Sequence, residues 1–342
     1  DRRSAGEGRV LEGTPEEFAA LLPFAPTAAQ RRAMEDIAAD LGSGRAMNRL
    51  VQGDVGSGKT AVAAFGAWAA VKSGVQCAMM APTELLAEQH ARTMEALLAP
   101  AGVRVGLLTG SVKGREKKEL LAGLASGEID LVVGTHALFS QGVEYHSLGL
   151  VIADEQHRFG VAQRGALAEK GGAVSTHVLV MSATPIPRTL ALIIYGDLDV
   201  SVINELPPGR TPVSTYLVGE DKRQRMYGFV RKQVGEGRQA YIVCPSVEEN
   251  AGGWEDGPGM DLKAVTAYAK ELQEKVFPDL RVGLVHGKLK SKEKEAAMVA
   301  FTQGEMDVLV STTVIEVGVD VPNASLMIVE NAERFGLSQL HQ

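Results

Sequence analysis

The chain is predicted to be an α/β protein of two tandem units, each with a mainly parallel sheet flanked by helices. Short, near-continuous apolar runs alternate with segments of helical period, which is typical of parallel strands buried on both faces. The alternation stops at Asn204-Glu-Leu-Pro-Pro-Gly-Arg-Thr-Pro212, where three prolines and a glycine favour a stiff connector. It then resumes, so the two halves are predicted to be similar units.

The elements follow in order from the apolar runs and the helical periods between them. Strands are predicted over 48–52, 76–81, 103–108, 129–134, 148–153 and 177–182, and helices over 60–73, 84–98, 115–125 and 186–195. After the connector, strands are predicted over 213–218, 239–244, 281–285, 306–311 and 325–329, and helices over 222–234, 262–276 and 291–302. The acidic, glycine-containing segment 247–260 predicts a surface loop.

These elements give a domain plan for the chain. Residues 1–22 lack an apolar period and are assigned to a tail or linker, and 23–203 form the first lobe. Residues 204–212 are the connector, and 213–342 form the second lobe.

Composition excludes several classes of protein. With 342 residues, 45% hydrophobic and 23% charged, the chain is neither disordered nor fibrous. It contains no apolar run long enough to span a bilayer and no signal peptide, so we expect a soluble, cytoplasmic protein. Cys77 and Cys244 lie far apart in apolar runs, which argues against a disulfide framework or a zinc site. The net charge of −7 excludes nucleic-acid binding by bulk positive charge, but not by the local basic clusters 113–118 and 288–294.

A phosphate-binding loop is the strongest chemical signal. Gly53-Asp-Val-Gly-Ser-Gly-Lys-Thr60 fits G-x-x-x-x-G-K-[ST] and lies between a predicted strand and a predicted helix. Glycines at 53, 56 and 58 let backbone N–H groups, including that of Ser57, face the phosphates. Lys59 would then reach the β- and γ-phosphates and Thr60 would bind Mg²⁺. The alternative, a glycine-rich turn with a chance lysine, does not explain this context.

A pair of carboxylates supplies the second half of the predicted site. Asp154 and Glu155 end the apolar run Leu150-Val-Ile-Ala. In phosphate-loop enzymes an Asp at such a strand end holds Mg²⁺, and the adjacent Glu is suited to polarise the attacking water. Alone, the pair would be a solvated turn; after a phosphate loop it predicts a nucleoside triphosphatase.

Further motifs resemble those of superfamily 2 helicases, in the family's order. Asp154-Glu-Gln-His157 resembles motif II, Ala81-Pro-Thr-Glu84 motif Ia, and Ser182-Ala-Thr184 motif III. Val285-His-Gly287 and Ser311-Thr-Thr-Val-Ile-Glu-Val-Gly-Val-Asp320 resemble motifs IVa and V. The resemblance implies two tandem RecA-like lobes that bind ATP and Mg²⁺.

The resemblance also assigns roles residue by residue. Nucleotide contacts are implied for Phe24, Thr27, Gln30, Gly318 and Asp320, with Gln30 reading the adenine edge. DNA contacts are implied for Pro82, Thr83, Thr135, His136, His286, Gly287 and Thr313. Thr109 and Gly110 join this set because they follow a predicted strand of the first lobe, at the edge where parallel sheets bind ligands. A coupling role, in which hydrogen bonds relay the state of the motif II carboxylates to the other lobe, is implied for Gln156, His157, Ser182 and Thr184. Capping explains single threonines such as Thr83 equally well, but not the whole set.

Within the superfamily the chain resembles the RecG family of branch-migrating DNA helicases. The strings that carry this are Asp154-Glu-Gln-His-Arg-Phe-Gly160, Met181-Ser-Ala-Thr-Pro-Ile-Pro-Arg-Thr-Leu190, Leu206-Pro-Pro-Gly-Arg-Thr-Pro212 and Glu333-Arg-Phe-Gly-Leu-Ser-Gln-Leu-His-Gln342. The resemblance implies branch migration of stalled forks and Holliday junctions by a monomer associated with the bacterial nucleoid, with branched and duplex DNA as partners.

Two alternatives stay open. The transcription-repair coupling translocases share Thr184-Pro-Ile-Pro-Arg-Thr-Leu190, although Gln156-His157 favours RecG. The family's motif VI, with an arginine that reaches the nucleotide, would follow Gln342, so we expect a motor fragment that binds ATP and hydrolyses it poorly. Such a fragment could also serve as a nucleotide-dependent DNA-binding module.

Overall fold

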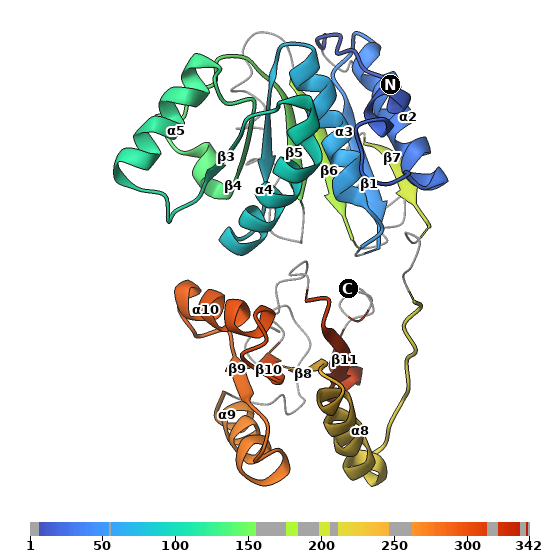
Figure 1. Ribbon diagram of the computed structural model, residues 1–342, viewed down its shortest axis with the longest axis vertical. Coiled ribbons are helices and arrows are strands. Elements are labelled where there is room, and N and C mark those ends of the chain that lie inside the picture. The colour runs from blue at the N-terminus through green and yellow to red at the C-terminus, as the bar shows by residue number, and fades with distance from the viewer. Residues whose placement is uncertain are drawn as a thin grey trace. The chain divides into compact units, whose positions relative to one another are not determined.

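The computed structural model describes residues 7–54, 56–154, 176–183, 198–205, 211–245, 262–312, 321–335 and 340. The chain divides into two compact units: unit 1, Asp1–Arg210 with Gln342, and unit 2, Thr211–His341. Both are parallel α/β units, which confirms the predicted fold class (Figure 1).

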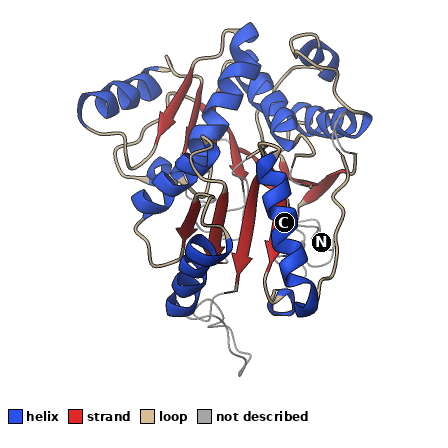
Figure 2. Cartoon of the chain, turned by 60° about the horizontal axis from the view of Figure 1, so that its bottom comes forward, coloured by secondary structure: helices blue, strands red, loops and turns tan. Residues whose placement is uncertain are grey.

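Unit 1 is a seven-stranded parallel sheet in the order β3-β4-β2-β5-β6-β1-β7, with helices beside it (Figure 2). Its strands are β1 (Asn48–Gly53), β2 (Gln76–Met80), β3 (Val105–Leu108), β4 (Leu131–Gly134), β5 (Leu148–Asp154), β6 (His177–Ser182) and β7 (Asp199–Ile203). Its helices are α1 (Pro15–Ala19), α2 (Ala28–Gly42), α3 (Lys59–Lys72), α4 (Glu84–Leu98) and α5 (Gly114–Ser126), with short 3₁₀ turns at Ala99–Ala101 and His136–Phe139.

Strand β2 shows why the apolar runs form central strands. Its side chains alternate between the two faces of the sheet. Cys77 and Met79 join one buried core, which includes residues of α2, α3 and α4. Ala78 and Met80 join a separate core that includes Leu124 of α5. Because both faces are covered, every position of the strand must be apolar or internally bonded.

Residues 7–22 differ from the predicted tail. His177 is fully buried; its Nδ1 accepts from the backbone N–H of Met47 at 2.9 Å, and its Nε2 lies 2.7 Å from the backbone oxygen of Arg9. Leu11 and Phe18 are buried in the core, and the Phe18 ring lies 5.5 Å from that of Trp68. Residues 7–22 are therefore packed on unit 1, held by contacts that a local apolar period does not reveal.

Unit 2 is a four-stranded parallel sheet in the order β11-β8-β10-β9. Its strands are β8 (Gln239–Cys244), β9 (Val282–Val285), β10 (Val308–Thr312) and β11 (Ala324–Val329). Its helices are α8 (Arg223–Gly235), α9 (Leu262–Glu271) and α10 (Ser291–Thr302), with a π-helical turn at Leu272–Val276 and 3₁₀ turns at Glu220–Lys222 and Ala332–Arg334.

One predicted strand is wrong, and three elements of the described residues were not predicted: β7, α1 and α2. Residues 213–218 form no strand, and Val213, Tyr216 and Leu217 are more than four-fifths exposed. Strand β7 was missed because Asp199 and Ser201 interrupt its apolar run, as an edge strand allows. Helix α2, capped by Thr27, was also missed. The predicted helix over 186–195 and the loop over 247–260 lie outside the described residues.

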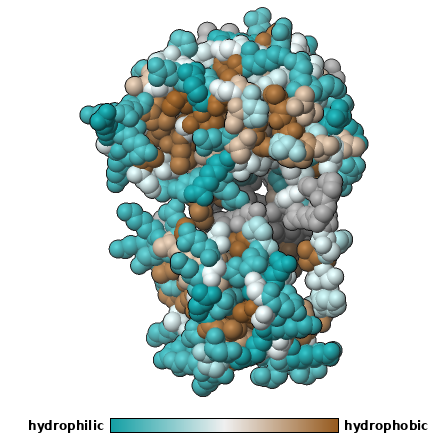
Figure 3. Space-filling model, in the orientation of Figure 1, coloured by the Kyte–Doolittle hydropathy of each residue, from teal (hydrophilic) through white to brown (hydrophobic). Residues whose placement is uncertain are grey.

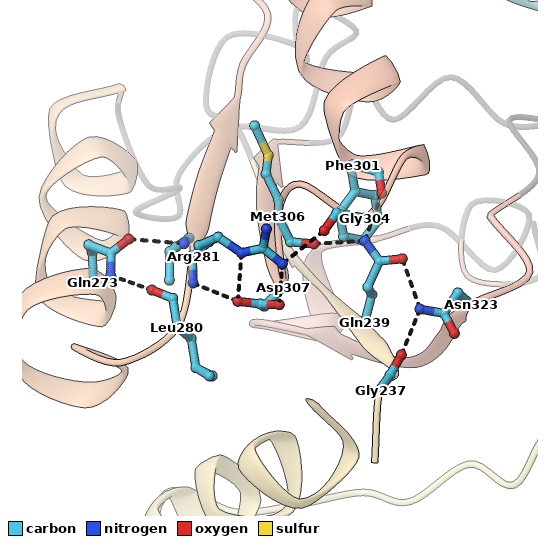
Figure 4. A network of polar contacts seen from close by, with 11 residues as sticks. Gly237, Gln239, Gln273, Leu280, Arg281, Phe301, Gly304, Met306, Asp307 and Asn323 are labelled. Carbon is cyan, nitrogen blue, oxygen red and sulfur yellow. Dashed lines mark hydrogen bonds and ion pairs between the residues drawn. The ribbon is translucent and has the colours of Figure 1, made fainter. Parts of the chain in front are cut away.

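An Arg–Asp–Gly clamp ties the amino ends of β9 and β10 in unit 2 (Figure 4). The Arg281 backbone N–H and Nε donate to Asp307 Oδ2 at 2.8 and 3.2 Å, and its guanidinium also donates to the Gly304 carbonyl at 2.8 Å. Burial alone would raise the pKa of Asp307, but hydrogen bonds from Arg281 hold it below its usual value. Beside the clamp, buried Gln239 donates to the Phe301 and Met306 carbonyls at 2.7 Å each.

Unit 1 repeats this clamp at β3 and β4. The Arg104 backbone N–H and Nε donate to Asp130 Oδ2 at 2.9 and 3.1 Å, and the guanidinium donates to the Gly127 carbonyl at 3.1 Å. Gln76 donates to the carbonyls of Leu124 and Ile129 at 2.9 and 2.8 Å. In both units the Arg and Asp are 26 residues apart. The two units therefore share one scaffold, down to its polar contacts.

The surface is largely hydrophilic on the face seen in Figure 3, with apolar residues gathered in patches. None of the described helices combines the length and the apolar character that a bilayer span requires.

Candidate functional site

Parallel strand order brings the two strongest sequence motifs to one edge of unit 1. Asp154 at the end of β5 is in register with Met181 of β6, and Met181 with Val51 of β1. The phosphate loop follows β1 directly. Because neighbouring strands lie about 4.8 Å apart, Asp154 and the start of the loop are about 10 Å apart at the carboxyl edge. Ser182, also buried, ends the strand between them.

The phosphate loop has the backbone that its glycines predict. Gly56 and Gly58 adopt left-handed φ values of 75° and 87°. Helix α3 begins at Lys59, so its unpaired N–H groups face the loop. Lys59 Nζ donates to the carbonyls of Gly53 at 2.7 Å and Asp54 at 2.9 Å. The ammonium group is thus held within the loop where a phosphate would bind. Val55 of the loop lies outside the described residues.

Gln30 of α2 forms a hydrogen bond to the phosphate loop. Its Oε1 accepts from the Thr27 backbone N–H at 2.8 Å, and its Nε2 donates to the Gly58 carbonyl at 3.3 Å. A Cβ at Gly58 would lie 1.9 Å from that Nε2, so position 58 has no room for a side chain. Gln30 is buried, whereas Phe24 is 45% exposed. The structure thus assigns Gln30 a positioning contact, and its reading of adenine stays a prediction.

The loop also presents an unpartnered polar atom. Ser57 Oγ is buried and makes no hydrogen bond to the described residues. A buried hydroxyl without a partner costs about 1–3 kcal/mol. A ligand with oxygen acceptors would relieve that cost, and a helix N-terminus favours an anion. The loop residues therefore fit a phosphate group.

Asp154 has a partner that the sequence did not reveal. His90 Nε2 of α4 lies 2.6 Å from Asp154 Oδ2, and the two side chains are only 12% and 11% exposed. Glu155, Gln156, His157 and Thr184, which the sequence placed beside or near Asp154, lie outside the described residues. Their roles remain predictions.

The predicted DNA contacts of unit 1 follow three adjacent strands, β3, β4 and β2. Thr83 caps α4 through the Leu86 N–H, and Glu84 accepts from the Ser111 N–H at 3.1 Å. Thr135 Oγ1 is buried without a partner among the described residues. The remaining predicted residues, Pro82, Thr109, Gly110 and His136, lie at the same edge, just after β2, β3 and β4.

Unit 2 places its predicted residues at its own carboxyl edge. His286 and Gly287 follow β9, and His286 Nδ1 is buried without a partner in the described part of the chain. The hydroxyls of Ser311 and Thr312 at the end of β10 share that property. Thr313, Gly318 and Asp320 lie outside the described residues.

Sequence reasoning missed His90 and Glu205. Glu205 Oε2 accepts from the Ala29 N–H at 3.2 Å, which fixes the start of α2 beside the loop. His90 had a signal: it occupies an apolar stripe of α4, four residues from both Leu86 and Met94, which are buried. Glu205 follows an edge strand, and no pattern in the sequence around it indicated a role at the site.

Comparisons with known proteins match both units. Residues 27–193 match the DEAD/DEAH box helicase family, and residues 221–342 match the helicase conserved C-terminal domain. Similar proteins named ATP-dependent DNA helicase RecG occur in Synechocystis sp., 53% identical over 96% of this chain and 38% of that protein, and in Bacillus subtilis, 52% identical over 95% and 46%. The chain thus spans less than half the length of these relatives.

Solved structures agree. A structure of RecG bound to a three-way DNA junction matches with a TM-score of 0.83 at 45% identity, over 98% of this chain and 43% of that one. The helicase Lhr of Mycobacterium smegmatis, bound to single-stranded DNA and AMP-PNP, has a TM-score of 0.59 at 19% identity, over 89% of this chain and 43% of that one, and shows the shared fold alone. On the matches to both halves and this identity, the chain belongs to the RecG family of superfamily 2 helicases.

Proposed function

We propose that this chain binds ATP with Mg²⁺ and uses its hydrolysis to move branched DNA, in the manner of a RecG motor acting as a monomer on the bacterial nucleoid. The observation that carries the proposal is the carboxyl edge of unit 1. There a phosphate loop and a buried carboxylate lie two strands apart in register.

The nucleotide would be held by unit 1. Lys59 would exchange its bonds to the Gly53 and Asp54 carbonyls for phosphate oxygens, which form stronger, charge-assisted bonds. The Ser57 hydroxyl, which has no partner among the described residues, would gain one. Half-exposed Phe24 would support the base beside Gln30.

The donor set of this edge fits a hard cation. Thr60 and Asp154 would hold Mg²⁺ through oxygen ligands, which that cation prefers. When bound, Mg²⁺ neutralises charge on the β- and γ-phosphates. Glu155 would accept a proton from the attacking water. A hydrogen-bonded relay from this site to the other lobe would involve Gln156, His157, Ser182 and Thr184.

DNA would lie along the carboxyl edges that carry unpartnered polar atoms. The side-chain atoms Thr135 Oγ1 in unit 1 and His286 Nδ1 and Thr312 Oγ1 in unit 2 are buried and lack partners among the described residues. Phosphate oxygens accept from hydroxyl and ring N–H donors without a large positive surface charge. This is compatible with the net charge of −7. The structure of RecG with a three-way junction supports a branched substrate.

DNA-dependent ATP hydrolysis tests this function. We expect the chain to bind a three-way junction more tightly than linear duplex of equal length, and to hydrolyse ATP faster with the junction than without it. Asp154→Asn should abolish hydrolysis while junction binding persists.

A single-turnover assay at enzyme excess suits the test, because it measures hydrolysis even where repeated turnover is slow. Hydrolysis in the Asp154→Asn variant at the wild-type rate, or equal affinity for junction and linear duplex, would contradict the proposal.

A further inference from the structure

His90 occupies an unusual place for a polar side chain. Helix α4 buries Leu86, Ala87, Met94 and Leu98 against the sheet and α3. His90 lies in the same stripe, one turn after Leu86 and one turn before Met94, and its side chain is 12% exposed. An apolar residue would fill this position at lower desolvation cost. The polar side chain at this position is therefore explained by its contact.

What it contacts is the carboxylate at the end of β5. Nε2 of His90 donates to Oδ2 of Asp154 at 2.6 Å, and both side chains are nearly buried. A short hydrogen bond to a carboxylate is among the stronger ones in proteins, and low exposure protects it from water. The contact fixes the rotation of the Asp154 carboxyl group, because it uses Oδ2 alone.

The helix that carries His90 begins at the other part of the same edge. The Thr83 hydroxyl accepts from the Leu86 N–H at 3.2 Å and caps α4. Glu84 accepts from both the N–H and the hydroxyl of Ser111, at 3.1 and 2.5 Å, in the turn after β3. Helix α4 therefore joins the carboxyl ends of β2 and β3 to Asp154.

We propose that His90 is a positioning residue for Asp154, which sets its carboxylate for Mg²⁺–ATP and links it to the start of α4. This inference rests on the proposed function, because it assumes that Asp154 serves the metal. Removal of a residue that hydrogen-bonds to a metal-binding carboxylate and orients it typically lowers metal affinity or activity by about 10–100-fold.

The test is the Mg²⁺ dependence of nucleotide binding, measured at one pH with a fluorescent ATP analogue. In the His90→Ala and His90→Asn variants, the Mg²⁺ concentration for half-maximal binding should rise about 10–100-fold. His90→Gln should restore it to near the wild-type value, because a glutamine amide can place its N–H where Nε2 lies and asparagine is one methylene too short. Binding of the analogue in EDTA should be the same in all four proteins.

Two results would overturn the inference. One is a Mg²⁺ dependence in His90→Ala and His90→Asn that equals the wild type. The other is an equal loss of binding with and without Mg²⁺, which would show a purely structural role. Thermal unfolding identifies a misfolded variant, and the Gln–Asn comparison remains decisive if alanine is not tolerated.

The Asp154→Asn variant separates this inference from the proposed function. If Asp154→Asn leaves the Mg²⁺ dependence unchanged, the proposed metal role of Asp154 fails and the inference fails with it. If Asp154→Asn raises the Mg²⁺ requirement and His90→Ala does not, only the inference fails. The double variant should require no more Mg²⁺ than Asp154→Asn alone, because both changes act through one carboxylate.

Discussion

Units 1 and 2 are alike at the amino ends of their strands and different at the carboxyl ends. Each unit has a buried Gln that donates to two carbonyls, and an Arg bonded to an Asp and a Gly. At the carboxyl edge, unit 1 has the phosphate loop, Gln30 and the His90–Asp154 pair. The edge of unit 2 has His286, Ser311 and Thr312, whose buried polar atoms lack partners in the described part of the chain.

This difference indicates that one set of residues stabilises the fold and another set determines what each unit binds. The repeated clamps hold helix ends and strand starts together, so they determine the α/β scaffold wherever it occurs. The residues at the carboxyl edge decide what each scaffold binds, as is usual for parallel sheets. Changes to the clamps should therefore affect both units equally, whereas changes at the phosphate loop should affect unit 1 alone.

The largest effect is expected from the buried glutamines. Gln76→Leu leaves the Ile129 carbonyl without its donor, and Gln239→Leu does the same to the Met306 carbonyl. The other two carbonyls, of Leu124 and Phe301, keep backbone donors from His146 and Gly304. Each substitution should lower the free energy of unfolding of its own unit by about 1–3 kcal/mol, measured by urea denaturation. A loss confined to one of the two variants would break the equivalence of the units.

The next effect distinguishes the phosphate loop from an ordinary left-handed turn. Gly58→Ala and Gly304→Ala both place a side chain at positive φ, 87° and 78°, which costs about 1–2 kcal/mol. Only at Gly58 does the new Cβ meet another group, Nε2 of Gln30. We expect weaker binding of an ATP analogue in Gly58→Ala alone. Equal binding by both variants would show that the Gln30 contact is dispensable.

A smaller effect should have opposite signs for stability and binding. Thr135→Val and Thr312→Val remove buried hydroxyls that have no described partner, so each variant should be more stable by about 1 kcal/mol. Each should also bind junction DNA several-fold more weakly in fluorescence anisotropy at fixed salt. Thr93→Val is the control, because its hydroxyl donates to the Gln89 carbonyl at 3.0 Å and its loss should destabilise. Unchanged DNA affinity would remove these hydroxyls from the interface.

The last effect is a pH dependence confined to unit 1. Burial lowers the pKa of His177, so the unfolded chain binds this proton before the folded chain does as the pH falls. The stability of unit 1 should therefore be complete above about pH 6.5, the value for an unperturbed His, and decrease as the pH falls toward the lowered pKa. Trp68 fluorescence in a Trp254→Phe background reports urea midpoints of unit 1 between pH 7.5 and 5.5. His177→Gln should flatten the slope; a wild-type slope in that variant would assign it to other groups.

The sequence predicted most of the fold because strands that are buried on both faces are mainly apolar along their length. Strands β2 and β5 are buried at every position, and local composition suffices to find them. The edge of a sheet obeys a weaker rule. Residues 213–218 have strand-like composition without a strand partner, while β7 pairs with β1 despite Asp199 and Ser201.

The site was predictable where it is contiguous. Eight adjacent residues specify the phosphate loop, and Asp154 is marked by the strand that precedes it. His90 and Asp154 are 64 residues apart, and Glu205 and Ala29 are 176 apart, so their contacts depend on how α4 and β7 pack. Such pairs follow from tertiary packing, and the local sequence marks at most one member, as the apolar stripe of α4 marks His90.

The central claim is that the edge of unit 1 binds a nucleoside triphosphate through Lys59. Equilibrium titration with a fluorescent ATP analogue and Mg²⁺ tests it most directly. The wild-type chain should bind at a single site, and Lys59→Ala should weaken binding at least about 10-fold, because charge-assisted hydrogen bonds contribute about 1.5–3 kcal/mol each. Equal binding by the wild type and Lys59→Ala would contradict the account.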